Sequence, residues 1–126
     1  MPLYSINGPR LNQTLEELGH LGESPDGMDR VAYSPEDILG RNYSINLMRD
    51  AGLETRIDTA GNIIGRISGV DDSLPAIAIG SHTDTVPKGG KYDGTLGVLG
   101  AIEVIRPLKQ QGHPTRPPLE TLNFTN

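Results

Sequence analysis

Three stretches of the chain carry apolar residues at intervals of three and four, the spacing that places side chains on one face of an α-helix. The first stretch covers residues 8–22, where leucines recur; Asn7 suits its N-cap, and Gly19 or Gly22 would end the helix. The third stretch covers residues 95–112. The second starts after Ser34, whose hydroxyl suits an N-cap, and stops at Gly52. The pattern predicts three helices with an aliphatic core between them.

Four other stretches have the composition of strands. Residues 53–58 and 62–68 are joined by a short connection that contains glycine, which predicts an antiparallel hairpin. Residues 76–79 contain no polar position, which predicts a strand buried on both faces. Residues 119–126 read as a last strand, parallel to residues 76–79 across the third helix. The expected fold class is α/β, with helices packed on a mixed sheet and a C-terminal βαβ unit.

Composition narrows the class of protein. The 126 residues suit one domain, and the net charge of -5 comes with scattered Lys and Arg, which argues against a nucleic-acid surface. There is no cysteine, so a metal would have to be held by histidine and carboxylates. The first residues lack the apolar core of a signal peptide, and no apolar run reaches membrane-spanning length. We expect no membrane partner and a cytoplasmic location.

The stretch from Gly80 to Gly94 reads GSHTDTVPKGGKYDG and directly follows the apolar strand. Ligands of open α/β sheets gather beyond the carboxyl ends of the strands, where His82, Asp84 and Asp93 would meet. These residue types suit a divalent metal such as Zn²⁺ or Mn²⁺. In this interpretation His82 and Asp93 are metal ligands, while Asp84 accepts the other ring N–H of His82 and fixes its tautomer.

Two other interpretations of the loop stay open. An isolated His-x-Asp is common, and its histidine is usually a surface or capping residue. Alternatively, the glycines and Lys91 before a helix could cradle a phosphate. Tyr92 stands where the Walker motif requires Ser or Thr, however, and Asp93 would repel an anion.

Longer motifs that include these residues resemble those of a known protein family. The chain carries GNIIGR, GSHTDTVP, GGKYDG and a terminal NFTN in that order. In these motifs, and over nearly its whole length, it resembles the hydantoinase/carbamoylase family of amidases, which belongs with the aminoacylase-like dinuclear metallopeptidases. The resemblance implies that His82 is a metal ligand, that Asp93 bridges two metals and that Asp84 orients His82 in catalysis. It also implies a cis bond between Asp93 and Gly94.

The family reaction is hydrolysis of a linear C–N bond in N-carbamoyl amino acids, allantoate or ureidopropionate. It uses two divalent metal ions, Zn or Mn and in some cases Ni or Co, and the family enzymes are expected to be homodimers. In the family, NFTN is followed by two glutamates, a general base and a metal ligand, but this sequence stops at Asn126. The resemblance therefore implies that residues 1–126 are a partial catalytic, metal-binding domain, without the rest of that domain or the dimerisation domain.

A second hypothesis belongs to another class of function. The 126 residues could themselves be a non-catalytic module that binds at most a metal or a protein partner. The substrate-binding residues and the choice among carbamoyl and ureido substrates are not assigned by the sequence.

Overall fold

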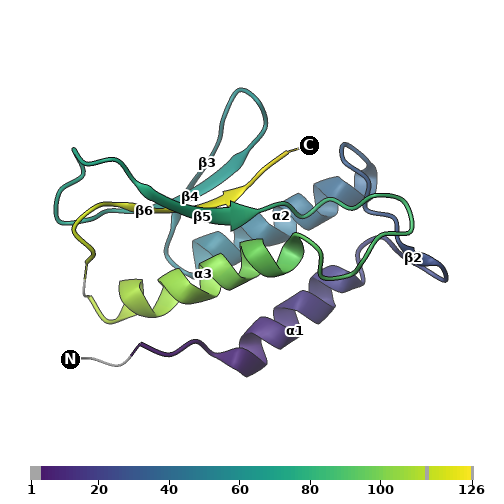
Figure 1. Ribbon diagram of the computed structural model, residues 1–126, viewed down its shortest axis with the longest axis horizontal. Helices are drawn as coiled ribbons and strands as arrows, with labels where there is room; N and C mark the ends of the chain where they lie inside the picture. Colours follow the sequence, from purple (N-terminus) through teal and green to yellow (C-terminus); the bar gives the residue numbers. More distant parts are fainter. Residues whose placement is uncertain (1–3, 113, 126) are drawn as a thin grey trace.

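The computed structural model describes residues 4–112 and 114–125. Three helices lie along one side of a four-stranded sheet (Figure 1). In chain order the elements are α1 (Gly8–Gly19), β1 (Glu23–Ser24), β2 (Gly27–Met28), α2 (Pro35–Asp50), β3 (Glu54–Ile57), β4 (Ile63–Ile67), β5 (Ile77–Ser81), α3 (Thr95–Gln110) and β6 (Leu119–Asn123). The α/β class and the mixed sheet predicted from the sequence are confirmed.

The strands of the main sheet lie in the order β3-β4-β6-β5. β3 and β4 form the predicted antiparallel hairpin, and β5 and β6 are parallel across α3 as predicted. β6 is antiparallel to β4, with Ile64 opposite Leu122. Within the described residues β6 therefore lies between two strands that precede it, and it joins the hairpin to the βαβ unit.

Local sequence explains where the helices begin. The side chain of Asn7 accepts a hydrogen bond from the Arg10 N–H, and the Ser34 hydroxyl accepts one from the Asp37 N–H. A proline follows each cap, at a position where the missing N–H has no helical partner. Both N-caps were predicted, and α1 ends at Gly19, one of the two predicted stops.

The core lies between the helices and the sheet. Its most deeply buried members are aliphatic, and they come from all three helices and from β4: Leu18, Met48, Ile63, Val98 and Ile105. Full burial of a side chain of this size contributes about 1.5–3 kcal/mol. The scarcity of aromatic residues thus leaves a core of interlocking aliphatic side chains.

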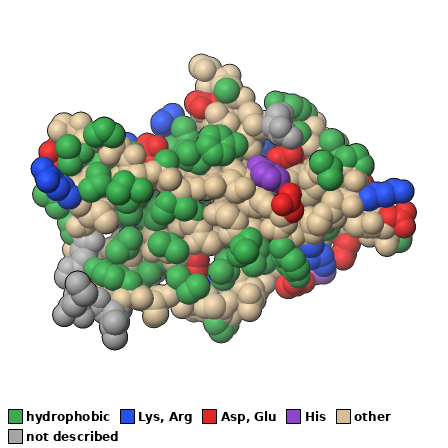
Figure 2. Space-filling view, viewed as in Figure 1, with side chains coloured by type: hydrophobic (Ala, Val, Ile, Leu, Met, Phe, Trp, Pro, Cys, Tyr) green, Lys and Arg blue, Asp and Glu red, His purple; other side chains and the backbone are tan. Residues whose placement is uncertain are grey.

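The prediction that residues 76–79 are buried on both faces is wrong. β5 is an edge strand, and Ile77 and Ile79 are 53% and 39% exposed. On the neighbouring α3, Leu96 and Val104 are 53% and 45% exposed. We call these four residues the apolar face, and Figure 2 shows hydrophobic side chains gathered over β5 and α3. Within the described residues no further strand pairs with the outer edge of β5, which is why this apolar run is not buried.

The segment from Glu23 to Met28, which is rich in Gly, Pro and Asp, forms a small hairpin of β1 and β2. The hairpin is anchored to the rest of the fold by two hydrogen bonds between the backbones of Met28 and Gly89. No helix in residues 4–112 or 114–125 is long and apolar enough to cross a membrane. The cellular location stays a prediction.

Glu103 ties the N-terminal segment to α3. The side chain of this residue, which is 4% exposed, receives two hydrogen bonds from the Arg10 guanidinium, at 3.0 and 2.5 Å, and one from the Asn7 N–H at 3.1 Å. Burial alone would raise the pKa of Glu103, but the hydrogen bonds and the charges of Arg10 and Arg106 outweigh it and lower the pKa. The folded state therefore favours the carboxylate.

Glu103→Gln is expected to lower the free energy of unfolding at neutral pH by about 1–3 kcal/mol, because it weakens buried charge-assisted hydrogen bonds. Because the pKa of Glu103 is lower in the folded state, this contribution is present above the unfolded value of about 4.3 and is lost as the pH falls through the folded value. Urea unfolding across that pH range measures it. Glu54→Gln, an exposed change of the same charge on β3, is the control. An equal loss in both variants would show that the contacts of Glu103 add nothing.

Candidate metal centre

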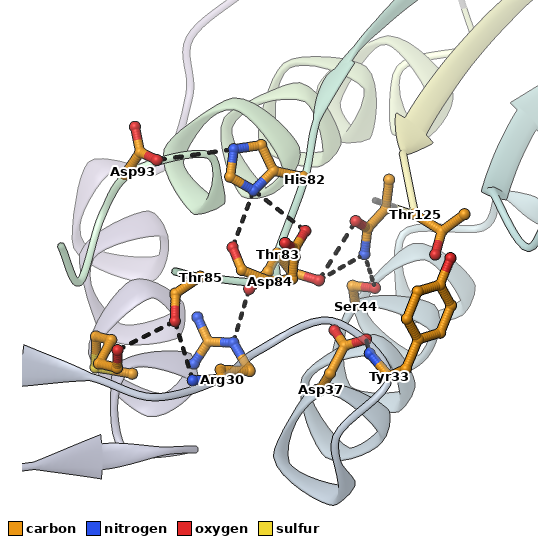
Figure 3. A network of polar contacts seen from close by, with 12 residues as sticks. Arg30, Tyr33, Asp37, Ser44, His82, Thr83, Asp84, Thr85, Asp93 and Thr125 are labelled. Carbon is orange, nitrogen blue, oxygen red and sulfur yellow. Dashed lines mark hydrogen bonds and ion pairs between the residues drawn. The ribbon is translucent and has the colours of Figure 1, made fainter. Parts of the chain in front are cut away.

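The candidate site lies where β5 ends. β5 runs to Ser81, the next residues turn across the end of the sheet, and the chain returns at Asp93 to start α3 at Thr95. Position 82 directly follows the carboxyl end of a strand, where its side chain leaves the sheet. The predicted juxtaposition is present, since His82 lies close to both Asp84 and Asp93 (Figure 3).

The two ring nitrogens of His82 have different surroundings. Nδ1 lies 2.9 Å from the main-chain oxygen of Asp84 and 3.4 Å from its carboxylate Oδ1. Nε2 faces Asp93, at 3.8 Å from Oδ2. A proton on Nδ1 would be accepted by Asp84, and in that tautomer the lone pair of Nε2 is directed at Asp93. The sequence predicted the carboxylate as the acceptor of the ring N–H, whereas the backbone carbonyl of the same residue is the nearer acceptor.

The separation of Nε2 and Oδ2 can be tested against a metal ion. Zinc bonds of about 2.0–2.2 Å place two ligands of one ion about 3.4 Å apart at the tetrahedral angle and at most about 4.3 Å apart. The 3.8 Å between His82 and Asp93 lies inside that limit and is too long for a hydrogen bond. The side chain of Asp93 is 83% exposed and that of His82 37% exposed, so both are accessible to an ion from solvent. These residues fit a divalent metal as two of its ligands.

Gly94 fixes the position of the His82 ring. Its φ is +72°, and a Cβ at this position would lie 2.5–2.6 Å from three ring atoms of His82. The ring thus packs directly on the backbone of the residue after Asp93. Only glycine allows both this backbone conformation and this close approach.

A buried polar network holds the opposite side of the site. Asn123, at the end of β6, donates to the hydroxyls of Thr83 at 2.9 Å and Ser44 at 3.1 Å. Asn123 is 1% exposed and Ser44 and Thr83 are buried with it. The N–H of Phe124 also donates to the Ser81 carbonyl at 2.8 Å. The terminal NFTN motif is therefore bonded to the segment that carries His82 and Asp84.

Two features differ from a complete metal site of the family: the peptide bond after Asp93 and the number of ligating side chains. Every peptide bond of the described chain is trans, so the expected cis bond between Asp93 and Gly94 is wrong. A trans bond is favoured by about 2.5–4 kcal/mol for residues other than proline. In addition, no group of three or more His, Cys, Asp or Glu side chains within the described ranges is arranged to hold a metal. Among the described residues the geometry therefore offers two candidate ligands, and the other positions of a bound ion would be left to water or to further protein groups.

No protein-family model matches the chain, but curated proteins do. Ureidoglycolate hydrolase from Arabidopsis thaliana is 44% identical over 123 residues, which cover 97% of this chain and 26% of the relative. An N-carbamoyl-L-amino-acid amidohydrolase from Paenarthrobacter aurescens is 41% identical over 120 residues, 95% of this chain and 29% of the relative. The chain thus spans between a quarter and a third of the length of these curated relatives.

A solved structure agrees with them. A hydantoinase/carbamoylase family amidase from Burkholderia ambifaria superposes with a TM-score of 0.93 at 39% identity, over 99% of this chain and 31% of that structure. The chain corresponds to the N-terminal portion of a hydantoinase/carbamoylase family amidase. This family was identified from motifs that include the loop of His82, and the comparisons confirm it.

The sequence alone did not reveal the residues that support the family motif. Thr83 and Asn123 stand inside quoted motifs, but nothing in their spacing says that they bond to each other. Arg30 and Ser44 are two further residues whose hydrogen bonds the sequence does not indicate. Each is buried and bonded to a segment about 40 or more residues away. Only the fold brings these partners together.

Proposed function

We propose that this chain is the N-terminal part of a metal-dependent amidohydrolase that cleaves linear C–N bonds in carbamoyl or ureido compounds. The observation that carries the proposal is the pair His82 and Asp93, oriented toward each other beyond the carboxyl end of β5. The names of the relatives support the substrate class, because they include hydrolases of ureidoglycolate and of N-carbamoyl amino acids.

Each residue has a distinct role in this proposal. His82 holds a divalent ion through Nε2, and Asp93 holds it through its carboxylate. Asp84 keeps the proton on Nδ1 and so leaves Nε2 free for the metal. When bound, the ion would act as a Lewis acid that polarises the substrate carbonyl and lowers the pKa of a bound water.

The chain by itself is expected to release no ammonia from N-carbamoyl amino acids or ureidoglycolate in the presence of Mn²⁺ or Zn²⁺. His82, Asp84 and Asp93 provide no general base, and loss of a general base alone reduces rates by about 10²–10⁴. The assay compares the parent chain with Asp93→Ala. Turnover in the parent that disappears in Asp93→Ala would show that the 126 residues are sufficient for catalysis.

The alternative of a non-catalytic module is tested by the gene. Two in-frame glutamate codons directly after Asn126 would support the amidohydrolase proposal. A stop codon at that place would support a stand-alone module. The same reading would show whether the remaining length of the relatives, including a dimerisation domain, is encoded downstream.

A further inference from the structure

Arg30 is the largest of the fully buried side chains, at 0% exposure. Its guanidinium bonds to backbone carbonyls of two separate segments. Nε donates to the Thr83 carbonyl at 2.7 Å (Figure 3), whereas Nη1 donates to Leu18 at 2.8 Å and to Leu21 at 2.5 Å. The side chain therefore connects the end of α1 to the residue between His82 and Asp84.

The backbone of Arg30 holds the same segment at a second point. The N–H of Arg30 donates to the Thr85 hydroxyl at 3.0 Å, and its carbonyl accepts from the Thr85 N–H at 2.7 Å. The Thr85 hydroxyl also donates to the Met28 carbonyl at 3.2 Å. Residues 83 and 85 are thus both bonded to Arg30, on either side of the Asp84 carbonyl that lies 2.9 Å from His82 Nδ1.

Burial of the Arg30 guanidinium carries a desolvation penalty, which a role in packing alone would not require. Nη2 is buried and has no hydrogen-bond partner among the described residues. Burial lowers the pKa of Arg30, while the nearby carboxylates of Asp37 and Asp84 raise it. Gly40 on α2 makes room for the side chain, because a Cβ there would lie 2.7 Å from the Arg30 Cδ. The fold accommodates a charged side chain where an apolar one would avoid the desolvation penalty.

We infer that Arg30 is a positioning residue of the candidate metal centre. By holding residues 83 and 85 it fixes the Asp84 carbonyl under Nδ1 of His82, and this selects the tautomer whose Nε2 faces Asp93. The inference has two consequences, one for the tautomer of His82 and one for metal affinity. Only the second, metal affinity, rests on the proposed function. The first consequence, the state of the His82 ring, belongs to the metal-free chain.

The first experiment measures the tautomer of His82 in the metal-free chain by ¹H–¹⁵N NMR, under conditions in which the ring signals show a single N–H proton. The parent is expected to carry the proton on Nδ1. Arg30→Lys keeps the charge but cannot bond to both segments in the same way, and it is expected to give a mixture of tautomers. Arg49→Lys, at an exposed arginine that bonds to Thr55, is expected to leave the tautomer of His82 unchanged.

Thr85 provides a second pair of variants in case the buried arginine is required for folding. Thr85→Val removes the hydroxyl that joins Arg30 to Met28 without changing charge, whereas Thr85→Ser keeps it. The valine variant is expected to show mixed tautomers and about 10–100-fold weaker binding of Mn²⁺, read from paramagnetic broadening. The serine variant is expected to match the parent in both measurements.

The outcomes separate the two proposals. If Mn²⁺ causes no broadening of the NMR signals of His82 in the parent chain, the proposed metal site is contradicted. The tautomer measurement would still decide whether Arg30 positions the His82 ring. Folded Thr85→Val with the tautomer of the parent overturns the inference, as does folded Arg30→Lys with the tautomer of the parent. Loss of stability with an unchanged His82 ring would mean that Arg30 serves the fold alone.

Discussion

Replacing His82 with alanine is expected to abolish specific metal binding by this chain. His82 supplies one of only two ligand positions that the described residues provide, and zinc usually requires four. Binding by the parent is therefore expected to be weak, and one carboxylate with 83% of its side chain exposed is not expected to hold an ion alone. Mn²⁺-induced broadening of the amide signals around residues 82–94 measures the effect. The fold should persist, since the half-buried side chain of His82 contributes one hydrogen bond, and the loss of such a bond costs about 0.5–1.5 kcal/mol.

The control is His20→Ala, because His20 is exposed and its ring Nδ1 lies 3.1 Å from Glu23 Oε2, outside the loop of residues 82–94. It should leave the broadening around residues 82–94 unchanged. Asp84→Asn gives a graded comparison, with affinity reduced about 10–100-fold, since the backbone carbonyl at position 84 still accepts the ring proton. Complete loss in Asp84→Asn would make Asp84 a direct ligand. Full binding by His82→Ala would leave the loop a structural feature.

Gly94→Ala is expected to damage the fold and the site together. The added Cβ would lie 2.5 Å from the His82 ring, and φ would remain at +72°, which alanine disfavours. The ring must move away, so Nε2 no longer faces Asp93. Stability should fall by about 1–3 kcal/mol, and Mn²⁺ binding should be lost to the same extent as in His82→Ala.

Gly100→Ala is a matched control with the opposite expected sign. Gly100 lies within α3, and a Cβ there would meet nothing within 4 Å. Alanine is favoured over glycine inside a helix by about 1 kcal/mol, so this variant should be more stable than the parent. Thermal unfolding and the Mn²⁺ titration measure both variants. If Gly94→Ala kept the stability and the metal binding of the parent, the close packing of His82 on residue 94 would have no consequence.

Features encoded by neighbouring residues could be predicted from the sequence, and those that depend on strand order could not. Ser34 and Asn7 cap their helices as predicted because a cap involves only the next three residues. Ile77 was expected to be buried because its own segment is apolar. Its exposure is decided by whether another strand lies beside β5, and nothing in the segment encodes that neighbour.

The candidate site shows the same division. The meeting of His82 with Asp93 was predictable, because both flank a strand end and a helix start that are close in sequence. The role of Arg30 was not, since its burial depends on carbonyls at positions 18, 21 and 83, which approach one another only in the folded chain. An arginine in a segment rich in Gly, Pro and Asp gives no local sign of being buried.

Because β6 lies between β4 and β5, the sheet cannot be completed until β6 has been synthesised. The hairpin of β3 and β4 and the unit of β5 and α3 each form from neighbouring residues, and both leave the ribosome before Leu119. The two parts join into one sheet only through β6, which pairs with β4 on one side and β5 on the other. Such pairing between distant segments is slow, because loop closure comes before the contacts that reward it. The newly made chain therefore presents the open edges of β4 and β5 until β6 has emerged, and unpaired strand edges of this kind favour aggregation.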